Sequence, residues 1–167
     1  MIQQTLAWQP DPADSNSCFC MIRLGMMVHR VRAIPLIRKF QKAIDQAARE
    51  AMQAQAGLLQ SERMIFRWNH FGYLQYWNTL DQMLAWSHEK PHTDWWAAAV
   101  NRQRKNQDFS IYHETYVVER GNFEAIYMNP GDHRPGASRF GTLVSPQGSL
   151  ATARGRLGKS HAGESKS

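Results

Sequence analysis

The stretch FSIYHETYVVERGNFEAIYMN, residues 109–129, decides the fold, and its pattern predicts a β-hairpin. Two runs rich in Tyr, Val, Ile and Phe flank residues 119–122, where Gly121 and Asn122 tolerate the positive φ of a short turn. Successive strand residues point to opposite faces, and bulky side chains occupy both faces of the first run. This predicts a strand covered on both sides, with His113 and Glu114 on opposite faces.

Length and composition indicate one globular domain. The chain has 167 residues, of which 43% are hydrophobic and 20% charged, so wholesale disorder is not expected. The net charge of +6 is spread along the chain rather than gathered into a stripe, which disfavours nucleic-acid binding. Without an apolar run of about 20 residues or a signal-peptide pattern, we expect a cytoplasmic protein that does not enter a membrane. Cys18 and Cys20 lack the second pair of a structural zinc site and are expected to be reduced.

Strand and helix patterns alternate along the chain. The predicted elements are a strand at 18–30, a helix opening at 33–35 and ending before Gly57, strands at 58–68 and 71–77, a helix capped by Thr79, a helical segment after Pro91 as far as Asn106, and the hairpin at 109–129. This strand–helix–strand–strand–helix–strand order predicts an α+β fold, the ferredoxin-like split βαβ sandwich with an antiparallel sheet and helices on one face.

The apolar character of both strand faces predicts that a second copy covers the other face of the sheet. We therefore expect a homodimer that forms a dimeric α+β barrel. The expected segments are an extended N-terminal arm at 1–16, the ferredoxin-like domain at 17–129, a loop-rich extension at 130–159 that packs on the domain or the partner, and a disordered tail at 160–167.

Four short motifs carry a resemblance to a known family. They are Tyr76-Trp77, the pentapeptide YHETY at 112–116, ASRFGTLV at 137–144 and TARGRL at 152–157. With the order of elements, they make residues 20–157 resemble the monooxygenase-like family that includes the monooxygenase of fumagillin-type terpenoid pathways. That family is similar to the antibiotic-biosynthesis-type monooxygenases of the dimeric α+β barrel superfamily.

The resemblance implies cofactor-independent oxygenation of an apolar or aromatic metabolite. In such enzymes the substrate loses a proton to form a stabilised carbanion, which reacts directly with dioxygen. The protein then supplies a base, an oxyanion stabiliser and an apolar cavity. The candidate catalytic residues are His113 and Glu114. The aromatic residues expected to line the cavity are Trp68, Tyr73, Tyr76, Trp77, Trp86, Tyr112 and Tyr116.

Each candidate also has a purely structural interpretation. His113 fits a histidine satisfied within the core, and Glu114 fits a partner for Arg23 or Arg67. His29 is expected at the rim of the sheet and His70 in a turn. His88, Glu89 and His92 have the H-E-x-x-H spacing of a zinc protease, but Pro91 lies between the two histidines and disfavours the continuous helix that such a site needs, so no metal site is expected.

Two other functions stay open. Several dimeric α+β barrels, aldoxime dehydratases among them, bind haem through a histidine, and His113, His70 or His29 could be the axial ligand here. A non-catalytic dimer that binds a small molecule is the third possibility. The sequence has no Walker loop, dinucleotide fingerprint or nucleophile elbow.

Overall fold

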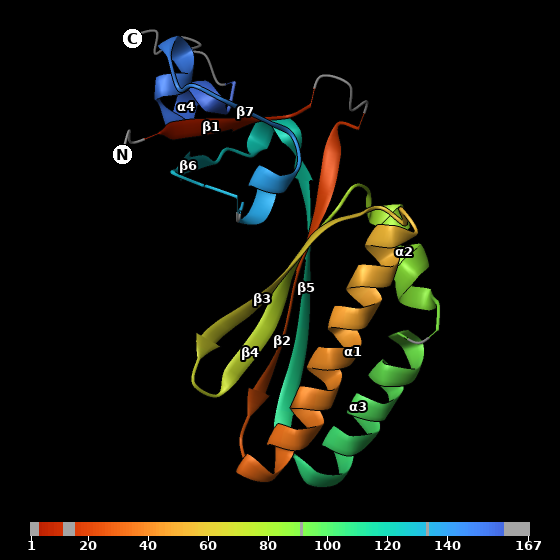
Figure 1. The fold of residues 1–167 in the computed structure, drawn as a ribbon. Coiled ribbons are helices and arrows are strands. Elements are labelled where there is room, and N and C mark those ends of the chain that lie inside the picture. The colour runs from red at the N-terminus through yellow and green to blue at the C-terminus, as the bar shows by residue number, and fades with distance from the viewer. Residues whose placement is uncertain (1–3, 12–15, 91, 133, 159–167) are drawn as a thin grey trace, which may run out of the picture. The chain divides into compact units, whose positions relative to one another are not determined.

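The computed structural model describes residues 4–11, 16–90, 92–132 and 134–158 (Figure 1). The chain forms two compact units. One contains residues 19–117, and the other combines residues 1–18 with residues 118–167. The predicted tail at 160–167 lies outside the described residues.

The larger unit contains a four-stranded sheet with three helices on one face (Figure 1). Its elements are β2 (Cys18–Val28), α1 (Ile34–Gln53), β3 (Leu58–Arg67), β4 (His70–Trp77), α2 (Leu80–His88), α3 (His92–Asn106) and β5 (Phe109–Glu119). The strand order is β3-β4-β2-β5, and β4 pairs antiparallel with both of its neighbours. This order is that of a split βαβ sandwich, so the predicted ferredoxin-like α+β fold is confirmed.

Local sequence signals explain where these helices begin and end. Pro35 lies in the first turn of α1, where its missing N–H costs nothing. Thr79 caps α2, and its hydroxyl accepts a hydrogen bond of 3.1 Å from the backbone N–H of Gln82. Gly57 has φ of 95°, which lets the chain turn sharply between α1 and β3.

The core of the larger unit lies between the sheet and its helices. One cluster of buried residues surrounds Trp77 and contains Cys20, Ile22, Ala48, Ala51, Leu58 and Met83. A second cluster, towards the other end of the helices, contains Met26, Val28, Ala33, Ile37, Phe40, Ala99 and Phe109. Together they fix α1, α2 and α3 against the sheet.

The predicted hairpin at 109–129 is wrong in its second half. β5 ends at Glu119, and residues 120–122 form a single 3-10 turn in which neither Gly121 nor Asn122 adopts a positive φ. The primed turn that joins two hairpin strands is therefore not formed. The second run becomes β6 (Ile126–Met128), which pairs with β1 (Thr5–Gln9) instead of β5.

The smaller unit is a three-stranded sheet in the order β6-β1-β7, where β7 is Thr142–Val144. Trp8 on the central strand is only 2% exposed and packs edge-on against Phe123 and Phe140. A short helix, α4 (Ala153–Arg156), completes this unit. Within the expected N-terminal arm, β1 thus forms the central strand of a sheet, pairs on both edges and buries a large aromatic side chain.

Candidate functional site

A cavity of about 390 Å³ lies between the sheet and the helices of the larger unit. Most of its lining is apolar and comes from five elements. The apolar lining residues are Ile22, Leu24 and Met26 on β2, Phe40 and Ile44 on α1, Met83 and Trp86 on α2, Trp95, Trp96 and Ala99 on α3, and Ile111 on β5. None of the residues found to line it is Asp, Glu, Lys or Arg. An apolar cavity of this size suits a small, uncharged organic molecule.

His92 is the most sharply defined polar group in the cavity. It begins α3, and its Nδ1 lies 2.8 Å from the carbonyl oxygen of Ser87. A carbonyl oxygen can only accept a hydrogen bond, so the proton is on Nδ1 and Nε2 carries a lone pair. Burial lowers the pKa of His92 below the ordinary 6.5, although the Ser87 carbonyl opposes this, and the rings of His113 and His88 lower it further. Burial of the ring therefore favours the neutral form of the imidazole.

The amide of Gln75 is buried in the sheet wall of the cavity, with 1% of the residue exposed. Its Oε1 accepts a hydrogen bond of 3.3 Å from the indole N–H of Trp77. Its Nε2 donates one of 3.2 Å to the hydroxyl of Ser61. Since an indole nitrogen can only donate, the contact with Trp77 fixes which end of the amide is oxygen.

His113 lines the same cavity from β5, where its Nε2 lies 2.8 Å from the hydroxyl of Thr115. Both residues point to the helix-facing side, as alternation along the strand requires. The side chain is solvent-exposed, so the structure corrects the interpretation of His113 as a core histidine. Within the described parts of the chain, no group of three or more His, Cys, Asp or Glu residues could hold a metal ion.

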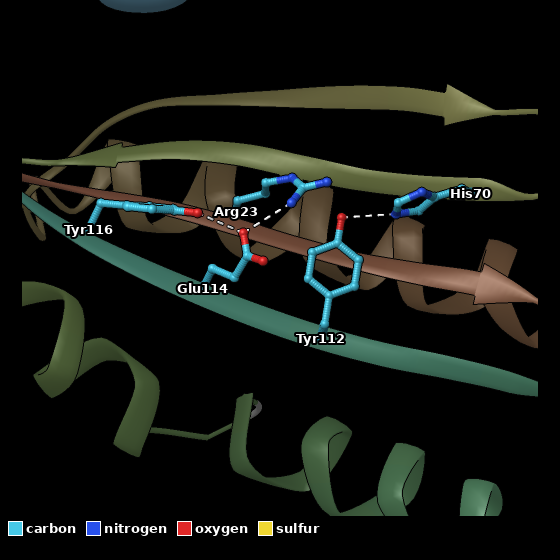
Figure 2. Close-up of polar contacts among 5 residues, drawn as sticks. All are labelled: Arg23, His70, Tyr112, Glu114 and Tyr116. Carbon is cyan, nitrogen blue, oxygen red and sulfur yellow. Dashed lines mark hydrogen bonds and ion pairs between the residues drawn. The ribbon is translucent and has the colours of Figure 1, made fainter.

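The opposite face of the sheet carries a separate polar network, which Figure 2 shows. Nη1 of Arg23 donates a hydrogen bond of 3.0 Å to Oε2 of Glu114, and the Tyr116 hydroxyl donates one of 2.8 Å to the same oxygen. The hydrogen bond from Tyr116 has the largest effect and that from Arg23 the next, and together they hold the pKa of Glu114 below its ordinary value of 4.5. The expected pairing of Glu114 with Arg23 is confirmed, and the carboxylate lies outside the cavity.

The rings of Phe66, His70 and Tyr112 complete this network. The hydroxyl of Tyr112 lies 2.9 Å from Nε2 of His70 (Figure 2). The guanidinium carbon of Arg23 lies 4.8 Å from the ring centroid of Phe66 and 5.1 Å from that of Tyr112. Burial lowers the pKa of His70, as do the positive charges of Arg23 and Arg67.

The ring of Tyr112 reaches His70 because Gly25 leaves room for it. A Cβ atom at Gly25 would lie 2.5 Å from the Tyr112 hydroxyl oxygen. Gly25 also pairs in register with Gly72, so two strands present no side chain at this point. The close approach of the tyrosine ring explains Gly25, whereas a Cβ at Gly72 would instead meet the carbonyl oxygen of Leu24 and the ring of Phe66.

Replacing Gly25 by alanine is expected to push Tyr112 away from His70. The loss of this hydrogen bond and of ring packing should lower the free energy of unfolding by about 1–2 kcal/mol, measured by chemical denaturation. In a Tyr112→Ala background the same substitution should cost far less, since the clashing ring is gone. Gly121→Ala is the control, because no atom lies within 4 Å of a Cβ there. Equal losses in both backgrounds would contradict the explanation.

The structure brings only part of the predicted site together. Of the seven aromatic residues expected to line the cavity, Trp86 and Tyr112 are among its lining residues, although the Tyr112 ring extends to His70 on the opposite face of the sheet. The other five do not, which corrects the prediction. Tyr73 and Trp77 are buried against α1 and α2, Tyr76 packs against Phe19, Tyr116 joins the network around Glu114, and Trp68 is 82% exposed beyond the end of β3.

Two of the three candidate axial histidines lie away from the cavity. His29 is exposed just after β2 and contacts the hydroxyl of Ser110 at 3.2 Å, as expected for the rim of the sheet. His70 is the first residue of β4 and points to the face opposite the helices. Among the three, His113 alone lines the cavity that the structure describes.

Sequence reasoning missed His92 as a site residue, although a signal was present. Trp95, Trp96 and Ala99 follow His92 by three, four and seven residues, the spacing of one helix face. That pattern places His92 on the apolar face of α3. Its spacing from His88 drew attention to zinc instead.

Comparisons with known proteins agree with this fold. The model of the family described as monooxygenase af470-like matches residues 19–134. Among solved structures, an aldoxime dehydratase in complex with butyraldoxime superposes with a TM-score of 0.62 at 15% identity, over 84% of this chain and 38% of the other. A second aldoxime dehydratase gives 0.63 at 14% identity, over 84% and 39%. The chain thus spans about two fifths of the length of these enzymes, and at such identities the likeness shows the fold alone.

A weaker match is SnoaB, a cofactor-independent oxygenase from Streptomyces nogalater, with a TM-score of 0.42 at 14% identity, over 60% of this chain and 93% of that one. No curated protein matches the sequence. No helix in the described ranges is both long and apolar enough to cross a membrane. The family match extends over the entire ferredoxin-like unit and the cavity inside it, and this chain therefore belongs to the monooxygenase af470-like family.

Proposed function

We propose that this protein is a cofactor-independent monooxygenase that acts on an uncharged, apolar or aromatic metabolite bound in the cavity. Family membership supports oxygenation, and the apolar lining supports the class of substrate. The lining offers aromatic rings and no acidic or strongly basic side chain, so a charged molecule would lose its hydration without gaining a partner.

The observation that carries the proposal is the hydrogen bond between Nδ1 of His92 and the Ser87 carbonyl, which leaves a lone pair on Nε2 of the neutral imidazole. With its proton held on Nδ1 by Ser87, its Nε2 can take a proton from an acidic C–H group of the substrate. The carbanion then reacts with dioxygen. For a methylene substrate, CH₂ plus O₂ gives C=O plus H₂O, so the substrate supplies all four electrons and no further reductant is needed.

His113 is proposed as the second imidazole of the reaction, able to receive the proton from the strand side of the cavity. Glu114 has no part in this scheme, because it lies on the other face of the sheet and is occupied by Arg23 and Tyr116. The proposal thus retains one of the two residues expected from the sequence and adds His92.

Oxygen uptake tests this function. The purified protein is incubated with benzylic ketones such as 2-tetralone, and oxygen consumption is followed with an electrode. Product mass should show the gain of one oxygen and the loss of two hydrogens. Binding is followed separately through tryptophan fluorescence, because Trp86, Trp95 and Trp96 line the cavity. Binding without oxygen uptake across a broad panel of carbon acids would favour the non-catalytic binding protein.

A haem protein is the second candidate, favoured by the same lone pair on Nε2 of His92. Neutral imidazoles are common axial ligands, and the indoles of the cavity suit a porphyrin face. Titration with hemin distinguishes the two functions. A sharp Soret band that saturates at one haem per chain, and disappears in His92→Ala or His113→Ala, would identify the haem protein. An unchanged hemin spectrum would leave cofactor-free chemistry.

We also propose that the protein is a homodimer, with a second copy against the sheet face opposite the helices. Support comes from the aromatic and paired charged side chains on that face. Sedimentation equilibrium tests this. A single species of monomer mass at micromolar concentration would exclude a stable dimer.

A further inference from the structure

The oxygen and the nitrogen of the Gln75 side-chain amide each make one hydrogen bond, but the nitrogen carries two hydrogens. Trp77 holds the oxygen and Ser61 accepts one of the two N–H bonds of Nε2. For the second N–H the described residues provide no acceptor. Leaving a buried donor without a partner costs free energy.

The position of this donor makes it available to a ligand. Gln75 is 1% exposed and lines the cavity from β4, a central strand of the sheet. Groups on the protein surface are therefore poorly placed to satisfy it. A molecule in the cavity that carries an acceptor oxygen would do so, and a hydrocarbon would not.

We infer that Gln75 recognises a carbonyl oxygen of the ligand, so that the preferred substrates are uncharged, largely apolar ketones or related carbonyl compounds. This inference rests on the proposed function. The inference specifies the chemical group of the substrate that is recognised, a carbonyl oxygen, and the residue that recognises it, Gln75. An acceptor is required because Nε2 can only donate, and charge is disfavoured because the lining lacks Arg, Lys, Asp and Glu.

The same hydrogen bond would assist the reaction. When His92 removes a proton from the carbon beside the carbonyl, negative charge moves onto the carbonyl oxygen as an enolate. A donor that is already oriented by Trp77 and Ser61 stabilises that oxygen without reorganisation. Gln75 on the sheet and His92 on α3 line the same cavity, so both would contact one bound substrate.

A matched pair of ligands tests the inference. Fluorenone and fluorene have the same ring system and differ in a carbonyl group against a methylene group. Affinities of both are measured by tryptophan fluorescence and calorimetry for the wild type, Gln75→Met and Gln60→Met. Gln60 is the control because it is also buried, at 6% exposure, and bonds Glu62 without lining the cavity.

We expect the wild type and Gln60→Met to bind fluorenone about 3- to 10-fold more tightly than fluorene, and Gln75→Met to lose this preference. The carbonyl stretching band of bound fluorenone gives a second reading that needs no variant. It should move to lower frequency in the wild type than in an apolar solvent, as hydrogen bonding to the oxygen requires.

Failure of this inference differs from failure of the proposed function. Equal affinities for the two ligands, with an unshifted carbonyl band, would overturn the role of Gln75 and leave the cavity as a binding site. A cavity that binds neither ligand would overturn both. A ketone preference that survives in a folded Gln75→Met variant would assign recognition to another residue.

Discussion

Replacing His92 by alanine is expected to lower the rate of oxygen uptake by about 100- to 10,000-fold, the range for loss of a general base. Affinity for fluorenone and the melting temperature should change little, because the imidazole contributes only one hydrogen bond to the Ser87 carbonyl and one ring contact with Trp86. Steady-state oxygen consumption with 2-tetralone measures the rate, and fluorescence titration measures the affinity.

The pH dependence gives a second test of this base. The neutral imidazole is the active form, so the rate rises with pH through the pKa of His92 and is level above it. Since burial lowers that pKa from 6.5, the rise should lie below pH 6.5 and the rate should be constant from about pH 7 upward. A rise centred well above pH 7 would point to another base.

His88→Ala is the matched control for His92→Ala. His88 also lines the cavity, but it is exposed, and no hydrogen bond to a carbonyl defines its tautomer among the described contacts. We expect the rate of oxygen uptake by His88→Ala to stay within a few-fold of the wild-type rate. If His88→Ala and His92→Ala lose activity equally, the role given to the fixed tautomer of His92 is wrong.

Replacing Trp77 by alanine should cause the largest loss of stability of any single change considered, about 3–5 kcal/mol. Trp77 is fully buried at the end of β4, packs against Trp86 at a centroid distance of 5.2 Å, and pairs in register with Cys20 and Leu58. Its removal opens a cavity that rigid strands on both sides cannot close. Chemical denaturation followed by circular dichroism gives the free energy of unfolding.

Trp68→Ala provides the comparison for Trp77→Ala. The same side chain lies nine positions earlier, where it is 82% exposed, so its loss should change stability by no more than about 0.5 kcal/mol. The amino-acid composition alone does not distinguish the buried tryptophan from the exposed one. Similar losses at the two positions would mean that Trp68 is covered in solution, for instance by a second copy of the chain.

The burial of one tryptophan and the exposure of the other could not be predicted from the sequence, whereas other features could. The order of strands and helices follows from periodicity, and the capped start of α2 follows from Thr79 and Gln82. The opposite orientation of His113 and Glu114 follows from strand alternation, and Arg23 was among the partners expected for Glu114. These features depend on neighbours along the chain or on one strand face, and local chemistry is sufficient for them.

What the tertiary structure alone decides involves partners far apart in the sequence. The run at 126–128 pairs with residues 5–7 because strand pairing is chosen among all available edges, whatever local pattern favours a hairpin. The lining of the cavity depends on which strand residues the helices cover, so Tyr73 and Trp77 are buried outside it. The tautomer of His92 likewise depends on a tertiary contact, because its Nδ1 meets the Ser87 carbonyl where α3 begins. The sequence therefore determined the fold, whereas three-dimensional packing selected the residues that line the cavity.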